Sequence, residues 1–185
     1  MKLRLPKRNR NFWNSDKLFG LTAMLISLVT LIIFVRQTNI MDKQSRLSAM
    51  PYLMIETSDN GYEHEFTFEL VNYGVGPAII EGKTIFHNGK SFEMEFDDFL
   101  KSNFDGMDTI NIISYATIQP GLAIPAGGSR TILKIGGSQD DYMTFKDFFS
   151  TTQEKNPINF EIRYRSIYND RWQISASNEI PQEIK

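Results

Sequence analysis

The feature that most constrains this chain is an apolar run near its N-terminus. Residues 18–35 read LFGLTAMLISLVTLIIFV and contain no charged residue and no proline. At about 1.5 Å per residue, a helix over this run is roughly 27 Å long, close to the ~30 Å hydrocarbon core of a bilayer. The run therefore predicts a transmembrane helix over residues 18–35, with the lipid bilayer as its partner.

The charges that flank this run predict its orientation. Six lysines and arginines precede it against one Asp16, whereas three follow it within residues 36–50. Because the more positive flank stays in the cytoplasm, residues 1–17 are expected to be cytoplasmic and the C-terminal part to lie outside. A cleaved signal peptide is the main alternative, and a buried soluble helix is another. No small-x-small cleavage site directly follows the run, which favours an uncleaved signal anchor.

Net charge differs strongly between the two ends of the chain. Residues 1–50 carry nine Lys/Arg and two Asp, a net of +7, whereas residues 51–185 carry eleven Lys/Arg and twenty Asp/Glu, a net of -9. An acidic outer part is repelled by nucleic acid, so no nucleic-acid partner is expected.

The absence of cysteine excludes disulfides, thiolate zinc sites and thiol nucleophiles, and no cofactor is predicted.

Beyond a stalk or linker over residues 36–50, the pattern becomes that of β-strands. Phe66, Phe68 and Leu70 alternate with polar residues, which is typical of a strand with one buried face. Similar patterns predict strands at 52–57, 64–70, 78–87, 92–96, 110–118, 131–135, 158–168 and 172–176. The fold class predicted for residues 51–178 is mainly β, an antiparallel immunoglobulin-like β-sandwich. Residues 179–185 are expected to form a polar tail.

Two short helices are expected to interrupt this sandwich. Residues 97–104 form either a short helix or a loop. Ser138 has the character of a helix N-cap with Asp141 three residues later. Aromatic residues then recur at helical spacing over 142–149. We therefore expect a helix with one aromatic face that lies across a sheet edge or the open end of the core.

The most specific motif of the outer part is NYGVGPA over residues 72–78. Gly74 and Gly76 permit close backbone approach, Pro77 stops one strand before the next, and the Asn72 side chain can bond the turn backbone. A phosphate-binding glycine loop is the sharper alternative. It needs a helix N-terminus after the glycines, whereas a strand pattern follows. The motif therefore predicts a tight structural corner.

This corner and its surroundings resemble a known type of protein. The pattern F-x-F-x-L-x-N-x-G-x-G-P-A over residues 66–78 follows an apparent membrane anchor, and IPAGG at 124–128, YRSIY at 164–168 and Trp172 complete it. Over residues 15–178, the chain resembles small bacterial single-pass membrane proteins with an immunoglobulin-like outer domain. The resemblance implies fold and topology, but no active site. It implies a bacterial inner membrane location with a periplasmic or extracellular C-terminal domain.

Several groups of side chains are candidates for chemistry or recognition. Arg163, Arg165 and Arg171 form a positive patch that could contact a partner. An aromatic set could line a ligand or glycan groove, although such residues usually form the core: Phe145, Phe148, Phe149, Tyr164, Tyr168 and Trp172. His64 and His87 could hold a metal if their strands were neighbours, and the acidic loop 97–108 could bind a cation. Incidental histidines and a solvated loop are the favoured interpretations.

These observations predict a non-catalytic, membrane-anchored binding or assembly module that contacts another envelope protein. One alternative is a ligand-binding or sensor domain for a small molecule or glycan. An envelope hydrolase is a further alternative, although the chain has no G-x-S-x-G motif. Ala23, Ser27 and Thr30 form a small-residue face that, extended by Gly20, could support a homo-oligomer within the bilayer.

Overall fold

The computed structural model describes residues 15–184. The chain divides into two compact units, residues 1–45 and residues 46–185. The predicted cytoplasmic segment 1–17 lies almost entirely outside the described residues.

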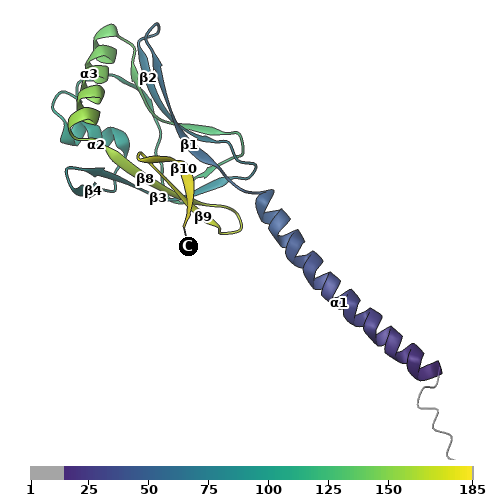
Figure 1. Cartoon of the computed structure of the whole chain (residues 1–185). Helices are drawn as coiled ribbons and strands as arrows, with labels where there is room; N and C mark the ends of the chain where they lie inside the picture. Colours follow the sequence, from purple (N-terminus) through teal and green to yellow (C-terminus); the bar gives the residue numbers. More distant parts are fainter. Residues whose placement is uncertain (1–14, 185) are drawn as a thin grey trace, which may run out of the picture. The chain divides into compact units, whose positions relative to one another are not determined.

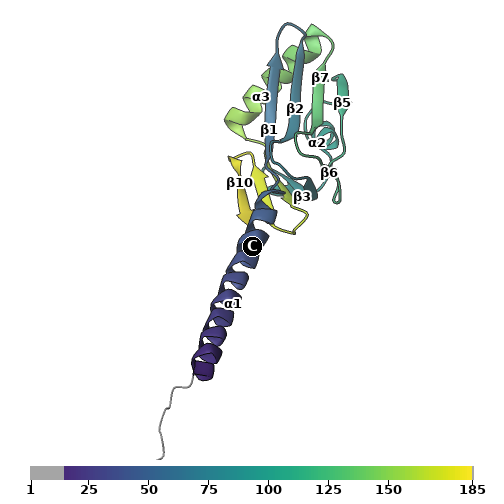
Figure 2. The ribbon, with the colours of Figure 1, turned by 90° about the vertical axis from the view of Figure 1, so that its right-hand side faces the viewer.

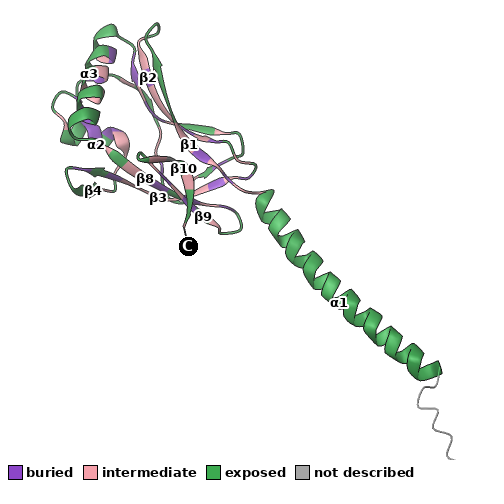
Figure 3. Ribbon diagram, in the orientation of Figure 1, coloured by how far each residue is buried: buried purple, intermediate pink, exposed green. Residues whose placement is uncertain are grey.

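The first unit consists of most of helix α1, which runs without interruption from Ser15 to Leu47. Every residue of α1 is exposed in the described structure, including its apolar run (Figure 3). The hydroxyls of Thr22 and Thr30 donate to the carbonyls four residues earlier, at 2.7 and 2.8 Å. Their polar groups are therefore satisfied inside the helix, as a bilayer requires. By length and composition, α1 can cross a membrane.

The second unit is mainly β, and its sheets are antiparallel, as the sequence predicts. The first sheet has the order β1-β2-β7-β5 (Figure 2). Its strands are β1 (Leu53–Asn60), β2 (Glu65–Asn72), β5 (Ile112–Tyr115) and β7 (Ser129–Gly136). The second sheet has the order β10-β9-β8-β3-β4, with β6 paired to β3. Its strands are β3 (Ala78–His87), β4 (Lys90–Phe92), β6 (Ala123–Ile124), β8 (Asn159–Arg165), β9 (Arg171–Ser175) and β10 (Asn178–Ile184).

Helices α2 (Phe96–Asn103) and α3 (Gln139–Lys155) lie between the diverging ends of the two sheets (Figure 1). The start of α3 follows from the sequence, because the Ser138 hydroxyl accepts the Asp141 N–H at 3.1 Å. The aromatic face of α3 points to the core, where Phe145 is 1% exposed. This helix therefore closes the end at which the sheets separate.

Both sheets contribute alternate side chains to one hydrophobic core. Leu53 and Leu70 enter it from the first sheet, and Ile85 and Ile162 from the second; all four are fully buried. Phe99 of α2 is buried in the same cluster. Burial of one face of β2 and of β8 is the physical result of their period-two pattern.

Three expectations about the strands need correction. The strand predicted over 92–96 ends at Phe92, because Glu95 turns inward to pair with Lys83 at 2.6 Å and Phe96 begins α2. The strand predicted over 110–118 is limited to Ile112–Tyr115.

The third correction concerns the tail predicted over 179–185. Strand β10 instead continues to Ile184 and pairs Gln182, Glu183 and Ile184 with β9. A strand at a sheet edge needs only backbone hydrogen bonds on one side, so its polar composition did not prevent pairing.

Candidate binding groove between the two sheets

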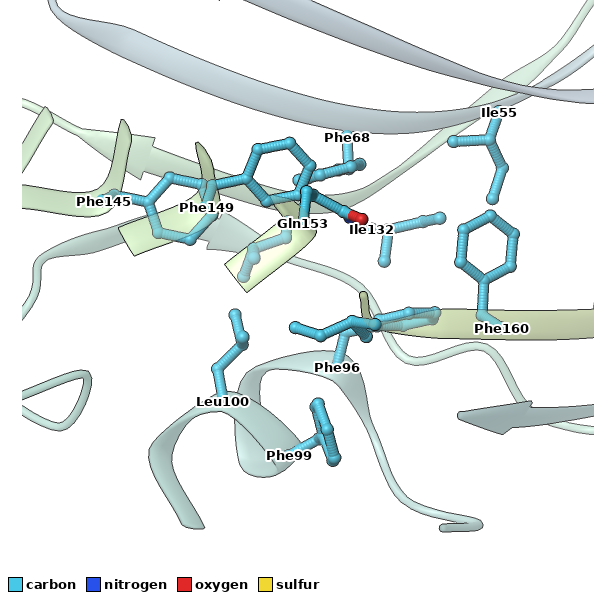
Figure 4. Close-up of a pocket in the computed structure, with 12 residues that line it drawn as sticks. Ile55, Phe68, Phe96, Phe99, Leu100, Ile132, Phe145, Phe149, Gln153 and Phe160 are labelled. Carbon is cyan, nitrogen blue, oxygen red and sulfur yellow. The ribbon is translucent and has the colours of Figure 1, made fainter. Parts of the chain in front are cut away.

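An apolar cavity lies between the two sheets, below α3. Its volume is about 60 Å³, and Figure 4 shows Ile55 of β1 and Phe160 of β8 pointing toward each other across it. Residues from both sheets and both short helices line it: Ile55, Phe68, Phe96, Phe99, Leu100, Ile132, Leu133, Phe145, Phe149, Gln153, Ile158 and Phe160.

The cavity continues into a wider groove of about 450 Å³ that opens to the surface. Ile55, Phe68, Phe149, Gln153 and Phe160 line both spaces. The groove is further lined by Thr57, Pro157, Asn159, Ile174, Ser175 and Ala176. This volume falls within the ~300–1,000 Å³ typical of ligand sites. The lining of the cavity is apolar, whereas that of the wider groove is polar and apolar in similar measure. We call the cavity and this space together the inter-sheet groove.

Contacts between aromatic rings fix one wall of the groove. The Phe149 ring lies 5.3 Å from that of Phe66 and 5.4 Å from that of Phe68, and it stacks on Phe145 at 6.0 Å. Offset and edge-to-face contacts of this kind hold rings in defined positions. The wall that α3 contributes is therefore preformed.

The polar side chains of the groove are neutral: Ser175 bonds the Ser177 hydroxyl at 3.1 Å, and three others are open to new hydrogen bonds. Within residues 15–184, the side chains of Thr57, Gln153 and Asn159 have no hydrogen-bond partner. Amides and hydroxyls can donate and accept hydrogen bonds, but they are poor general acids and bases at neutral pH. This lining suits recognition better than proton transfer.

Two polar contacts mark the ends of β1 along the groove. At one end, the Leu53 N–H donates to the Tyr164 hydroxyl at 3.3 Å. At the other, the Asp59 carboxylate accepts hydrogen bonds from Lys146, at 2.7 Å, and from the Tyr142 hydroxyl. The bond from Lys146, and then that from Tyr142, hold the pKa of Asp59 below its ordinary value. Burial raises the pKa of Tyr164 to about 12.

The predicted corner motif forms a dense set of backbone contacts around Asn72. The Asn72 side chain is fully buried, and its Nδ2 donates to the carbonyls of Gly76 at 2.9 Å, Ile124 at 3.0 Å and Pro125 at 3.2 Å. Its Oδ1 accepts the N–H groups of Tyr52 and Gly74, at 3.1 and 3.0 Å. A buried amide with all of its bonds satisfied specifies one geometry for the segments it joins.

The glycines of this motif allow two backbone segments to touch. A Cβ on Gly74 would lie 2.4 Å from the Tyr52 nitrogen, and one on Gly76 would lie 2.0 Å from the Ala49 carbonyl oxygen. Pro77 stands directly before β3, which begins at Ala78. The corner therefore packs closely against residues 49–52. In sequence, this segment follows α1 and leads into the first strand of the β domain.

The predicted arginine patch is placed on β8 and β9, next to carboxylates. Arg165 and Arg171 both approach Glu81, at 3.6 and 3.2 Å, and Arg163 approaches Glu161 at 3.6 Å. These carboxylates offset part of the positive charge that the sequence suggests.

The predicted aromatic set is divided between the core and the groove. Phe149 lines the inter-sheet groove, and Phe145 lines its cavity while belonging to the core. Tyr164 and Trp172 are core residues that stack at 5.9 Å. Phe148 packs on Phe104 at 4.7 Å. Helical spacing thus identified part of the groove wall.

The remaining candidates are separated from one another. His64 precedes β2 in the first sheet, and His87 ends β3 in the second; their Nδ1 atoms are buried without a partner in the described part of the chain. Asp97 of the acidic loop is buried beside Lys101, at 3.4 Å. Among residues 15–184, no three His, Asp or Glu side chains form a group that could hold a metal.

Sequence reasoning missed Ile55, Thr57, Gln153 and Asn159 as groove residues. The run 52–57 indicates a strand, but not an edge strand beside a gap in the core.

Comparison with known proteins identifies no family for this chain: no family model, curated protein or solved structure matches it.

Proposed function

We propose that this chain is a membrane-anchored, non-catalytic binding module of the bacterial cell envelope that contacts another envelope protein. The inter-sheet groove is the observation that carries the proposal. It combines an apolar floor, a preformed aromatic wall and neutral polar side chains at its rim, in a domain preceded by an apolar helix. Such a combination suits the binding of a partner and does not require any reaction on that partner.

The proposed anchor is α1, with the N-terminus in the cytoplasm and the β domain in the periplasm or outside the cell. The positive flank before residue 18 supports this orientation. Because the chain has no cysteine, single substitutions give an unambiguous test. A membrane-impermeant maleimide should label Ser102→Cys in intact spheroplasts, and Ser15→Cys only after the membrane is opened. The reverse pattern would contradict the orientation, and extraction of the chain by carbonate would contradict the anchor.

We also propose that the β domain is an immunoglobulin-like sandwich, in keeping with the sequence resemblance. Two antiparallel sheets that share one core support this assignment. Helices α2 and α3 between the sheets are the departure from a plain sandwich.

Site-specific photo-cross-linking in intact cells tests the binding function. A benzoylphenylalanine in place of Gln153 places the reactive group in the groove, whereas one in place of Ser102 on the exposed face of α2 is the matched control. The Gln153 variant should give one discrete adduct with another envelope protein, and the Ser102 variant should not. Identical adduct patterns for both positions, or no adduct from Gln153, would overturn the proposal.

A second candidate is a ligand-binding domain for a small molecule or glycan. Thr57, Gln153 and Asn159 beside the Phe149 and Phe160 rings favour it, because hydroxyls and amides bond sugars while rings pack against their apolar faces. A glycan bound only to the native state would raise the melting temperature of the detergent-solubilised chain. A panel of envelope glycans that leaves the melting temperature unchanged would count against this candidate.

A further inference from the structure

Strand β1 directs part of its backbone toward an open sheet edge. The Leu53 N–H bonds Tyr164 of the other sheet, and Asn72, which is paired opposite Leu53, sends its own N–H to the Gly128 carbonyl at 2.9 Å. Both observations show that the backbone of Leu53 points away from β2. In antiparallel pairs this direction alternates along the strand.

The same direction holds for the next alternate residues of β1. The β1–β2 register runs from Leu53 to Asn60 without a shift, so Ile55 and Thr57 also turn their N–H and C=O groups to the open edge. Strand β10 approaches β1, but within the described residues β1 pairs only with β2. Between Leu53 and Asp59, the backbone N–H and C=O groups at this edge can therefore pair with another strand.

The side chains of these two residues line the space beside that edge. Ile55 forms part of the apolar cavity, and Ile55 and Thr57 both line the wider groove. A strand laid against this edge would thus place alternate side chains into the inter-sheet groove, because side chains alternate across a strand. An unpaired backbone edge beside a gap in the core fits an extended polypeptide better than a sugar or an acyl chain, neither of which has a ladder of amides.

We propose that the inter-sheet groove receives an extended segment of the partner protein as an added strand on β1, with one apolar side chain in the cavity beside Ile55. The inference rests on the proposed binding function and names the chemistry of the partner. It is a case of strand addition, in which backbone bonds give affinity and the cavity gives specificity.

The ends of the open edge limit the length of this segment. At one end, the N–H of Leu53 already bonds the Tyr164 hydroxyl. At the other, the side chain of Asp59 bonds Lys146 and Tyr142. Strand residues rise by ~3.4 Å, so about five residues of the partner fill the interval.

The surrounding charges also define the segment. Glu56 lies on the opposite face of β1 and is exposed, and residues 51–185 carry a net charge of -9. A cross-strand neighbour of opposite sign stabilises a ladder, whereas a like charge opposes it. The segment should therefore have an apolar residue at the cavity, small or polar residues beside Thr57 and Asn159, and lysine or arginine on its outer face.

The test uses the full-length chain with the cross-linking group at Gln153, in intact cells. Thr57→Pro removes the N–H at the open edge, a position where an edge strand tolerates proline, and Thr57→Val keeps that N–H in a side chain of similar shape. Loss of one ladder bond should lower the adduct yield about fivefold to tenfold in Thr57→Pro. Thr57→Val should give the same adduct yield as the parent. The cross-linked peptide, identified by mass spectrometry, should come from another protein and alternate apolar and polar residues.

A second pair of variants covers the case in which Thr57→Pro does not fold. Ile55→Trp fills the cavity and leaves the backbone unchanged, and Ile55→Leu is its volume-matched control; thermal unfolding in detergent identifies which variants are folded. An adduct that persists in folded Thr57→Pro or Ile55→Trp would overturn strand addition and leave the binding function standing. An adduct with a second copy of the chain, a glycan or a lipid would also overturn it. Absence of any adduct in the parent would instead refute the binding function.

Discussion

The Tyr164 hydroxyl of β8 accepts the Leu53 N–H of β1 at 3.3 Å, and this bond connects the two sheets through the core. Both residues are fully buried. Leu53 is the first residue of an edge strand, so its N–H has no ladder partner, and Tyr164 supplies one from the opposite sheet.

Tyr164→Phe should lower the free energy of unfolding by about 1 to 2 kcal/mol, because it leaves the buried Leu53 N–H without an acceptor. The ring and its stacking on Trp172 remain. Urea denaturation of the full chain in detergent measures the effect. Tyr62→Phe, at a residue 93% exposed, is the matched control and should change stability by less than about 0.5 kcal/mol. Equal effects of the two substitutions would contradict the role assigned to the Leu53–Tyr164 bond.

The same hydroxyl should make stability fall at alkaline pH. Burial raises the pKa of Tyr164 from 10.0 to about 12 in the folded chain. Between these values the unfolded chain has released the proton and the folded chain has kept it. The stabilising contribution is therefore complete below pH 10 and is lost as the pH rises through the folded pKa, in total about 2 to 3 kcal/mol.

Thermal unfolding of parent and Tyr164→Phe at pH 9 and pH 11 isolates this contribution. The deficit of Tyr164→Phe should shrink by about 1 kcal/mol between the two values, because only the parent loses the Tyr164 contribution. Tyr73 and Lys146, whose pKa values are also raised, are present in both proteins and cancel in the difference. A deficit that is constant with pH would refute the assignment.

Asn72→Ala should be among the most destabilising single substitutions in the β domain. It removes five hydrogen bonds to backbone groups, in a site that is fully buried. We expect a loss of about 3 to 5 kcal/mol, measured by urea denaturation. Asn159→Ala removes an amide that has no partner in the described chain and should cost less than about 0.5 kcal/mol. A small effect of Asn72→Ala would show that water replaces the lost bonds.

Gly76→Ala tests the close approach in the same corner. Its Cβ would lie 2.0 Å from the Ala49 carbonyl oxygen, a contact that the backbone must move to relieve. At Gly82 the nearest atom to a new Cβ is the end of the Arg163 side chain at 3.5 Å, so Gly82→Ala is the matched control. Gly76→Ala should lower the thermal midpoint strongly and Gly82→Ala only slightly. Similar midpoints for both variants would refute the tight corner.

Local chemistry made much of this fold predictable. The dipeptide Asn88-Gly89 indicates a hairpin, and both residues have positive φ, 52° and 71°. Asn72 and its glycines predict a corner because each residue type has a specific backbone role. The helix start at Ser138 likewise depends on neighbours within three residues.

The groove could not be predicted in this way, because it depends on where two sheets separate. Ile55, Gln153 and Ser175 become neighbours only through the strand order, which no local pattern specifies. The carboxylates beside the arginine patch could not be predicted for the same reason. Glu81, which pairs with Arg165 and Arg171, is distant in sequence and close only in the folded sheet.

Asp59→Asn should reduce the acid sensitivity of the β domain. Hydrogen bonds from Lys146 and Tyr142 lower the pKa of Asp59 below 3.8, so its contribution is complete above that value and is lost as the pH falls through the lowered folded pKa. The group is exposed and screened by solvent, so the contribution is below about 1 kcal/mol. Thermal midpoints at pH 7 and pH 2.5 should differ less in Asp59→Asn than in the parent, whereas Asp105→Asn, an exposed carboxylate, should behave as the parent. If Asp59→Asn retains the full acid sensitivity, then Lys146 and Tyr142 do not stabilise the carboxylate at this end of β1, and the groove lacks the fixed boundary described above.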